Sequence, residues 1–171
     1  DQGMVDAQFV LGLCYLDGEG VAKDAEEAVK WFTVAAKNDN ADAQLYLAEC
    51  YAGGTGVKRS SKGAFYWYSK AAKNGMAAAQ TRLGVCYYRG MGTKKSTKHA
   101  RYWLQKASQQ GDEDASQMLA ELGYQDAEAR GAKKNPPDRD AAQQFLTHAS
   151  DTIVNLKIKN GELIDARRIG F

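Results

Sequence analysis

The sequence predicts an all-helical protein made of stacked helical hairpins, each about 36 residues long. Three tryptophans, Trp31, Trp67 and Trp103, follow one another at intervals of 36 residues. Internal repeats of this length are typical of solenoids, in which each unit packs mainly on its neighbours. Apolar residues recur at helical spacing within each unit, and the 171 residues include only two prolines.

The first helix of a unit is expected over residues 5–16, because Leu11, Cys14 and Tyr15 fall on one helical face. A Gly-x-Gly turn ends it, since glycine adopts left-handed backbone angles without penalty. The copy of this turn that reads GGTG lacks the Gly-Lys-Ser/Thr ending of a phosphate-binding loop. Gly12 and Gly84 lie inside helical patterns and therefore predict close approach of another helix.

The second helix is expected to start at Asp24, Ser60 and Ser96, whose side chains can accept hydrogen bonds from free N–H groups. Asp24 and Glu27 have the spacing of a capping box. Tryptophans alternate with alanines on this helix, which suits helices that interlock at short distance. We expect the tryptophans to lock neighbouring hairpins together.

These features resemble the Sel-one-like repeat (SLR) family, a relative of the tetratricopeptide repeats. In the first unit the matching residues are Ala7, Leu11, Gly12, Tyr15, Gly18, Gly20, Val21, Asp24, Ala28, Trp31, Phe32, Ala35 and Ala36. The match extends over three units, with mild departures such as Thr93 in place of valine. The resemblance implies a right-handed α-solenoid that binds other proteins, as an adaptor or scaffold in signalling, quality control or host interaction.

The expected domain boundaries follow from the repeat. Full SLR repeats are expected at 7–42, 43–78 and 79–114, and a degenerate one with a longer loop at 115–150. Residues 1–6 align with the exit of a preceding repeat, so we expect the chain to be part of a longer protein. Residues 151–171 are expected to form a capping helix extension and tail, with a hairpin about Asn160-Gly161 as the alternative.

Catalytic and metal sites are not predicted. The three cysteines stand one full repeat apart, too far for a disulfide, and are expected to be free, mostly buried thiols. No clustered metal ligands, nucleophile motif or cofactor fingerprint appears, so we expect a non-enzymatic protein without metal or cofactor. His99 and His148 are expected to be surface or rim residues.

Partner binding is the remaining function. In tetratricopeptide-like arrays the first helices line a concave groove, and positions there that differ between units are not required by the fold. They include tyrosine and arginine, which often dominate interface energy. The predicted partner-binding residues are Tyr46, Glu49, Arg82, Val85, Tyr88 and Arg89.

Charge suggests which partner is bound. Residues 7–42 carry a net charge of −4, whereas residues 43–78 and 79–114 each carry +4. Basic residues in the matching inter-helix loops should form one ridge, which is either a solvated edge or a surface for an acidic protein or peptide. RNA binding by this ridge is the alternative, although the chain's net charge of only +2 argues against it. No apolar run reaches the roughly 18 residues of a membrane span, so we expect a soluble protein. Its compartment is left open, with the bacterial periplasm and the cytoplasm as the options.

Overall fold

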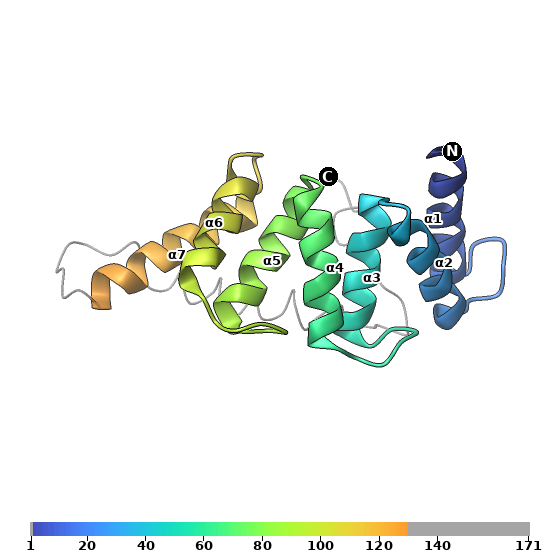
Figure 1. Ribbon diagram of the computed structural model, residues 1–171, viewed down its shortest axis with the longest axis horizontal. Coiled ribbons are helices and arrows are strands. Elements are labelled where there is room, and N and C mark those ends of the chain that lie inside the picture. Colours follow the sequence, from blue (N-terminus) through green and yellow to red (C-terminus); the bar gives the residue numbers. More distant parts are fainter. Residues whose placement is uncertain (1, 130–171) are drawn as a thin grey trace. The chain divides into compact units, whose positions relative to one another are not determined.

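The computed structural model describes the backbone of residues 2–129 and the side chains of residues 2–123. This part of the chain is all-helical, as predicted, and contains seven helices and no strand (Figure 1). The helices pack in pairs, α1 on α2, α3 on α4 and α5 on α6, and each pair packs on the next. Their bounds are α1 Gln2–Asp17, α2 Ala25–Lys37, α3 Ala41–Gly53, α4 Ser61–Lys73, α5 Ala77–Arg89, α6 Thr97–Ser108 and α7 Glu113–Ala129.

The three predicted caps start the second helices. Asp24 accepts a hydrogen bond from the N–H of Glu27, and Ser60 accepts one from the N–H of Gly63. Ser96 accepts one from the N–H of His99, whose ring also stacks on Tyr87 with centroids 5.0 Å apart. Each cap satisfies one of the N–H groups that a helix start leaves without a partner.

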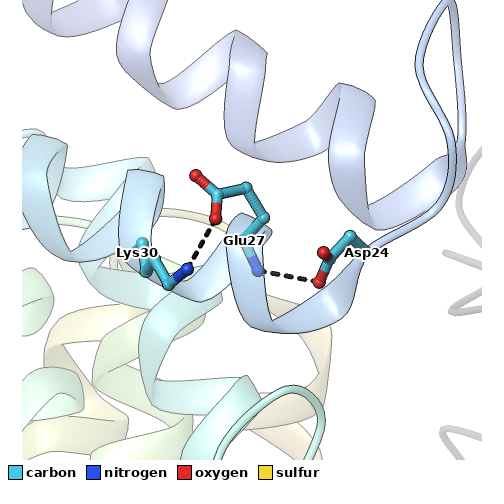
Figure 2. A network of polar contacts seen from close by, with 3 residues as sticks. All are labelled: Asp24, Glu27 and Lys30. Carbon is cyan, nitrogen blue, oxygen red and sulfur yellow. Dashed lines mark hydrogen bonds and ion pairs between the residues drawn. The ribbon is translucent and has the colours of Figure 1, made fainter.

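The capping box at α2 is only half formed. Glu27 does not return to the backbone of Asp24; its carboxylate accepts a hydrogen bond from Lys30 Nζ at 2.7 Å instead (Figure 2). The backbone N–H of Asp24 is already used, because it donates to the carbonyl of Tyr15 at 2.8 Å. The spacing of a capping box therefore produces only the half in which Asp24 accepts from the N–H of Glu27.

The core lies between the paired helices and consists mainly of alanines with one large residue per second helix. Phe32, Tyr68 and Leu104 occupy this position and are all buried. The neighbouring tryptophans are half-buried, although Trp67 and Trp103 do pack against the core cluster around Tyr68. The tryptophans thus contact neighbouring hairpins at the edge of the core, while the next residue along each second helix fills the middle of the core.

The predicted close helix approach at two glycines is confirmed. A Cβ atom on Gly12 would lie 2.5 Å from the Phe32 ring, and one on Gly84 would lie 2.7 Å from Cγ of Leu104. Real Cβ atoms do not approach this closely, so only glycine allows these first helices to lie against their partners. Phe32 on α2 and Leu104 on α6 therefore each fit against a stretch of backbone that carries no side chain.

The two ends differ in how far the structure describes them. Helix α1 begins at Gln2 rather than at residue 5, so the segment that aligns with the joints between repeats is helical here. Helix α7 contributes Ala115, Met118 and Leu122 to the buried core. The longer loop, the second helix of the fourth repeat, the capping extension and the alternative hairpin lie outside the described residues.

Candidate partner-binding surface

Helices α3 and α5, the first helices of two successive hairpins, carry all six residues predicted to bind a partner. Tyr46 and Glu49 lie on α3, and the other four lie on α5. Both helices end in a hairpin turn, at the left-handed C-cap residues Gly54 and Gly90, with φ angles of 81° and 75°. The structure brings some of the six residues together and separates others.

Glu49 and Arg82 face each other across the two hairpins. Their carboxylate and guanidinium groups form an ion pair at 3.7 Å, and the side chains keep 19% and 24% of their exposure. Both lie near Tyr68: burial and, secondarily, the Glu49 carboxylate raise the pKa of the Tyr68 hydroxyl, whereas Arg82 lowers it. The ion pair therefore lies above a neutral, buried phenol that belongs to the core.

Tyr46 and Val85 take part in packing more than the prediction of a binding role implied. The Tyr46 ring packs in a three-ring cluster, with its centroid 5.4 Å from that of Phe9 and 5.5 Å from that of Phe32. Val85 retains only 3% of its exposure. A partner could reach one side of the half-buried Tyr46, but Val85 belongs to the core and offers no contact surface.

Tyr88 and Arg89 occupy the end of α5. Tyr88 is half-buried, and Nζ of Lys95 lies 5.4 Å above the centre of its ring. Arg89 is exposed and is the last residue of the helix, where its positive charge complements the helix dipole. The accessible part of the predicted surface therefore consists of Glu49, Arg82, Tyr88 and Arg89, together with one side of Tyr46.

Two exposed tyrosines outside this surface were not singled out from the sequence. Tyr66 on α4 and Tyr102 on α6 keep 53% and 49% of their exposure. Their signal in the sequence is the interval of 36 residues together with a lysine four positions to either side. The adjacent tryptophans recur at the same interval and mask this pattern.

The cysteines are free, as predicted, and Cys50 and Cys86 are buried while Cys14 is half-buried. Burial raises the pKa of both buried thiols to about 12, so they remain protonated at neutral pH. A protonated, buried thiol is neither a nucleophile nor a metal ligand.

Within the described residues, no group of three or more His, Cys, Asp or Glu side chains is arranged to hold a metal ion. None of the helices described here has the length and apolar character needed to cross a membrane.

Comparisons with known proteins agree with this architecture. The model of the Sel1 repeat family matches residues 5–40, 41–76 and 77–112. No curated protein shows significant similarity to the chain.

Two solved structures share the fold. One is a protective antigen of uropathogenic Escherichia coli strains that displays an SLR fold, with 30% identity and a TM-score of 0.69 over 88% of this chain. This chain spans only 31% of that antigen's length. The other is a Sel1 repeat protein from Oxalobacter formigenes, with 39% identity and a TM-score of 0.65, covering 70% of this chain and 90% of that one. With three matched repeats and these structural relatives, the chain belongs to the Sel1 repeat family.

Proposed function

We propose that this protein is a non-enzymatic adaptor that binds a partner polypeptide on the surface formed by α3 and α5. Sel1 repeats are in general protein-interaction modules of scaffold type. The observation that carries the proposal is the Glu49–Arg82 ion pair, which joins charged side chains of two successive repeats on one accessible surface. The repeat does not require either residue, since the equivalent positions of the other full repeats hold Leu13 and Val85 for Glu49 and Val10 and Tyr46 for Arg82.

The chemistry of this surface suits a carboxylate on the partner. At 3.7 Å the Glu49–Arg82 contact is longer than a hydrogen bond. A partner carboxylate would therefore compete for Arg82 with a weak contact, and Arg89 lies seven residues, about two helical turns, further along α5. Tyr88 lies beside Arg89 and adds aromatic area. Tyrosine and arginine together are typical of residues that dominate binding energy.

Site-specific photo-crosslinking tests the proposal. A benzophenone amino acid is placed at Arg89 and, as a control, at Lys37, which is exposed at the end of α2. Extract of the source organism is irradiated with each protein, and the crosslinked peptides are identified by mass spectrometry. We expect a partner polypeptide that crosslinks from position 89 and not from position 37.

The identified partner then provides a quantitative test. Arg89→Ala should weaken its binding about tenfold, as expected for an interface hot spot, and should leave the thermal midpoint almost unchanged because the side chain is exposed. Lys37→Ala is the matched control and should bind normally. Unchanged binding by Arg89→Ala, or crosslinks from position 37 alone, would rule out the α3–α5 surface.

A further inference from the structure

Helices α4 and α6 each present the same three exposed residues along one face. Lysine, tyrosine and lysine follow one another at intervals of four residues, which keeps them on one side of a helix. The equivalent positions of α2 hold Glu26, Lys30 and Val34, so the repeat does not require this pattern. The set, called here the Lys-Tyr-Lys face, consists of Lys62, Tyr66 and Lys70 on α4 and Lys98, Tyr102 and Lys106 on α6.

The exposed tyrosines are held in place by the half-buried tryptophans. Tyr66 meets Trp67 edge to face with centroids 5.0 Å apart, and Tyr102 meets Trp103 in the same way at 5.1 Å. Both tryptophans pack against the core cluster of the middle hairpins. The aromatic part of the face is therefore ordered before a partner arrives, which lowers the entropic cost of binding.

The charge of this region has one sign. Between Cys50 and Gly111 the sequence contains twelve lysines and arginines and no aspartate or glutamate. Three of the twelve have partners outside the face: Arg82 pairs with Glu49, Arg101 donates to the carbonyl of Leu122, and Lys95 lies over the Tyr88 ring. The lysines of the Lys-Tyr-Lys face have no carboxylate on their own helices. Their positive field is therefore not neutralised locally.

The loop before α6 ties the two helices together. A Cβ atom on Gly92 would collide with the carbonyl oxygen of Ser61 and lie 2.9 Å from Cβ of Phe65, so this loop lies against the first turns of α4. The loop that leads into the α6 copy of the pattern therefore contacts the first turns of α4, where the other copy begins. On each helix the outer lysines are eight residues apart, which is about 12 Å along the axis.

We propose that the Lys-Tyr-Lys face binds an acidic polypeptide segment, independently of the α3–α5 surface. Carboxylates of the segment would pair with the lysines, and its apolar side chains would pack on the tyrosines. A polypeptide fits better than a single-stranded nucleic acid, because Nζ of Lys106 lies 5.1 Å from the Tyr102 ring centre and 5.5 Å from that of Trp103. The lysine covers one surface of the Tyr102 ring and so limits the stacking of a base there, whereas smaller apolar side chains can pack on the exposed parts of both tyrosines.

Binding of defined probes tests this proposal. The probes are a labelled 20-residue peptide of Glu-Glu-Leu-Glu repeats, its Gln-for-Glu counterpart and a 20-nucleotide polyuridylate, each followed by fluorescence anisotropy at two salt concentrations. We expect the acidic peptide to bind and the glutamine peptide not to bind. The proposal would be overturned if the acidic peptide did not bind. It would also be overturned if polyuridylate bound more tightly than the peptide and if Tyr66→Ala/Tyr102→Ala weakened that binding.

Matched variants separate the face from the general field. Changing Lys62, Lys70, Lys98 and Lys106 to Gln should weaken peptide binding at least about tenfold. The control removes the same charge from the neighbouring loops, at Lys58, Arg59, Lys94 and Lys95, and should weaken binding less than about threefold. Tyr66→Ala/Tyr102→Ala, which leaves the charge unchanged, should also weaken binding. Equal losses in the face and loop variants would show a diffuse electrostatic effect and overturn the proposal.

Zero-length carbodiimide coupling of the wild-type protein to the acidic peptide gives a second readout that needs no variant. The coupled lysines should be Lys62, Lys70, Lys98 and Lys106.

Arg89→Ala should bind the peptide normally, because that residue belongs to the α3–α5 surface. If Arg89→Ala lost peptide binding, the acidic segment would bind at the α3–α5 surface and this inference would be overturned. Normal peptide binding by Arg89→Ala leaves the crosslinking test of the α3–α5 surface unaffected.

Discussion

At the scale of single residues, the second glycine of each hairpin turn sets how closely successive repeats approach. Gly20, Gly56 and Gly92 all have left-handed φ angles, of 73°, 64° and 71°. A Cβ atom on Gly56 or Gly92 would collide with a backbone carbonyl in the first turn of the preceding second helix, whereas one on Gly20 would meet nothing within 4 Å. The glycine at this repeat position thus forms part of a turn in all three units. In two of them it also contacts the preceding hairpin.

Alanine substitutions separate these two roles. Gly20→Ala and Gly92→Ala both force alanine into a left-handed conformation, which costs about 1–2 kcal/mol. Gly92→Ala also inserts a methyl group into backbone contact, which adds about 1–3 kcal/mol. Urea denaturation should therefore show a clearly larger loss of unfolding free energy for Gly92→Ala. Equal losses would mean that the contact between the repeats adjusts without cost.

The buried thiols make stability depend on pH in the alkaline range. Burial raises the pKa of Cys50 and Cys86 to about 12 in the folded protein, whereas a thiol in the unfolded chain titrates near about 8.5. Between these values the unfolded state binds fewer protons than the folded state. The thiols' contribution to stability is therefore fully present below about pH 8.5 and is lost as the pH rises towards 12.

Denaturation at several pH values checks this sign. The free energy of unfolding of the wild-type protein should fall from pH 8 to pH 10.5, and the slope should be shallower in Cys50→Ala/Cys86→Ala. Cys14→Ala, which changes a half-buried residue, is the control and should keep the wild-type slope more closely. If the double variant keeps the full slope, groups other than these thiols cause it.

At the scale of elements, two buried glutamines link successive hairpins. The side-chain amide of Gln80 on α5 donates to the carbonyl of Ala72 at 3.2 Å and accepts a hydrogen bond from Gln110 at 2.8 Å. Gln44, one repeat earlier, makes the same pair of bonds with the carbonyl of Ala36 and the side chain of Asn74. Each glutamine thus joins the end of one hairpin to the end of the next.

Replacing the glutamine should uncouple these ends. Gln80→Leu removes both hydrogen bonds of this link, each worth about 0.5–1.5 kcal/mol, while the carbonyl of Ala72 still accepts a hydrogen bond from the N–H of Gly75 at 3.1 Å. Gln110→Ala removes one bond from an exposed residue and should cost about 1 kcal/mol or less. The two variants are compared by chemical denaturation. A neutral or stabilising Gln80→Leu would contradict a structural role for this link.

The helices and their caps could be predicted from the sequence because they depend on residues close together in the chain. The period of 36 residues, the cap residues and the bare backbone at Gly84 are local signals. The half-formed capping box could not be predicted, since the N–H of Asp24 is used by Tyr15 in the other helix of the hairpin. The burial of Val85 and the ring cluster around Tyr46 likewise depend on how successive hairpins stack, which a repeat period does not specify.

At the scale of the whole described unit, charge is divided unevenly along the chain. The first repeat is acidic, and the long segment from Cys50 to Gly111 is basic without any acidic residue. Like charges in a compact structure repel one another, and this repulsion opposes folding. The middle repeats therefore keep their positive field at some expense in stability.

Salt should relieve this repulsion. Raising NaCl from about 20 mM to about 150 mM shortens the screening length to about 8 Å and should raise the thermal midpoint. Lys58→Gln/Lys94→Gln should raise the midpoint at low salt and reduce the response to NaCl. Lys37→Gln in the acidic first repeat is the control and should not raise the midpoint. A midpoint that falls with added salt would show that attractive ion pairs outweigh the repulsion.

The main helix-to-helix packing described above joins elements that are consecutive in the chain, α1 with α2, α2 with α3 and so on to α7. Such contacts close short loops, and proteins rich in them fold fast. A hairpin can pack on its predecessor as soon as both have left the ribosome, without waiting for distant segments. New repeats can therefore be added to such a chain during evolution without slowing the folding of the repeats already present.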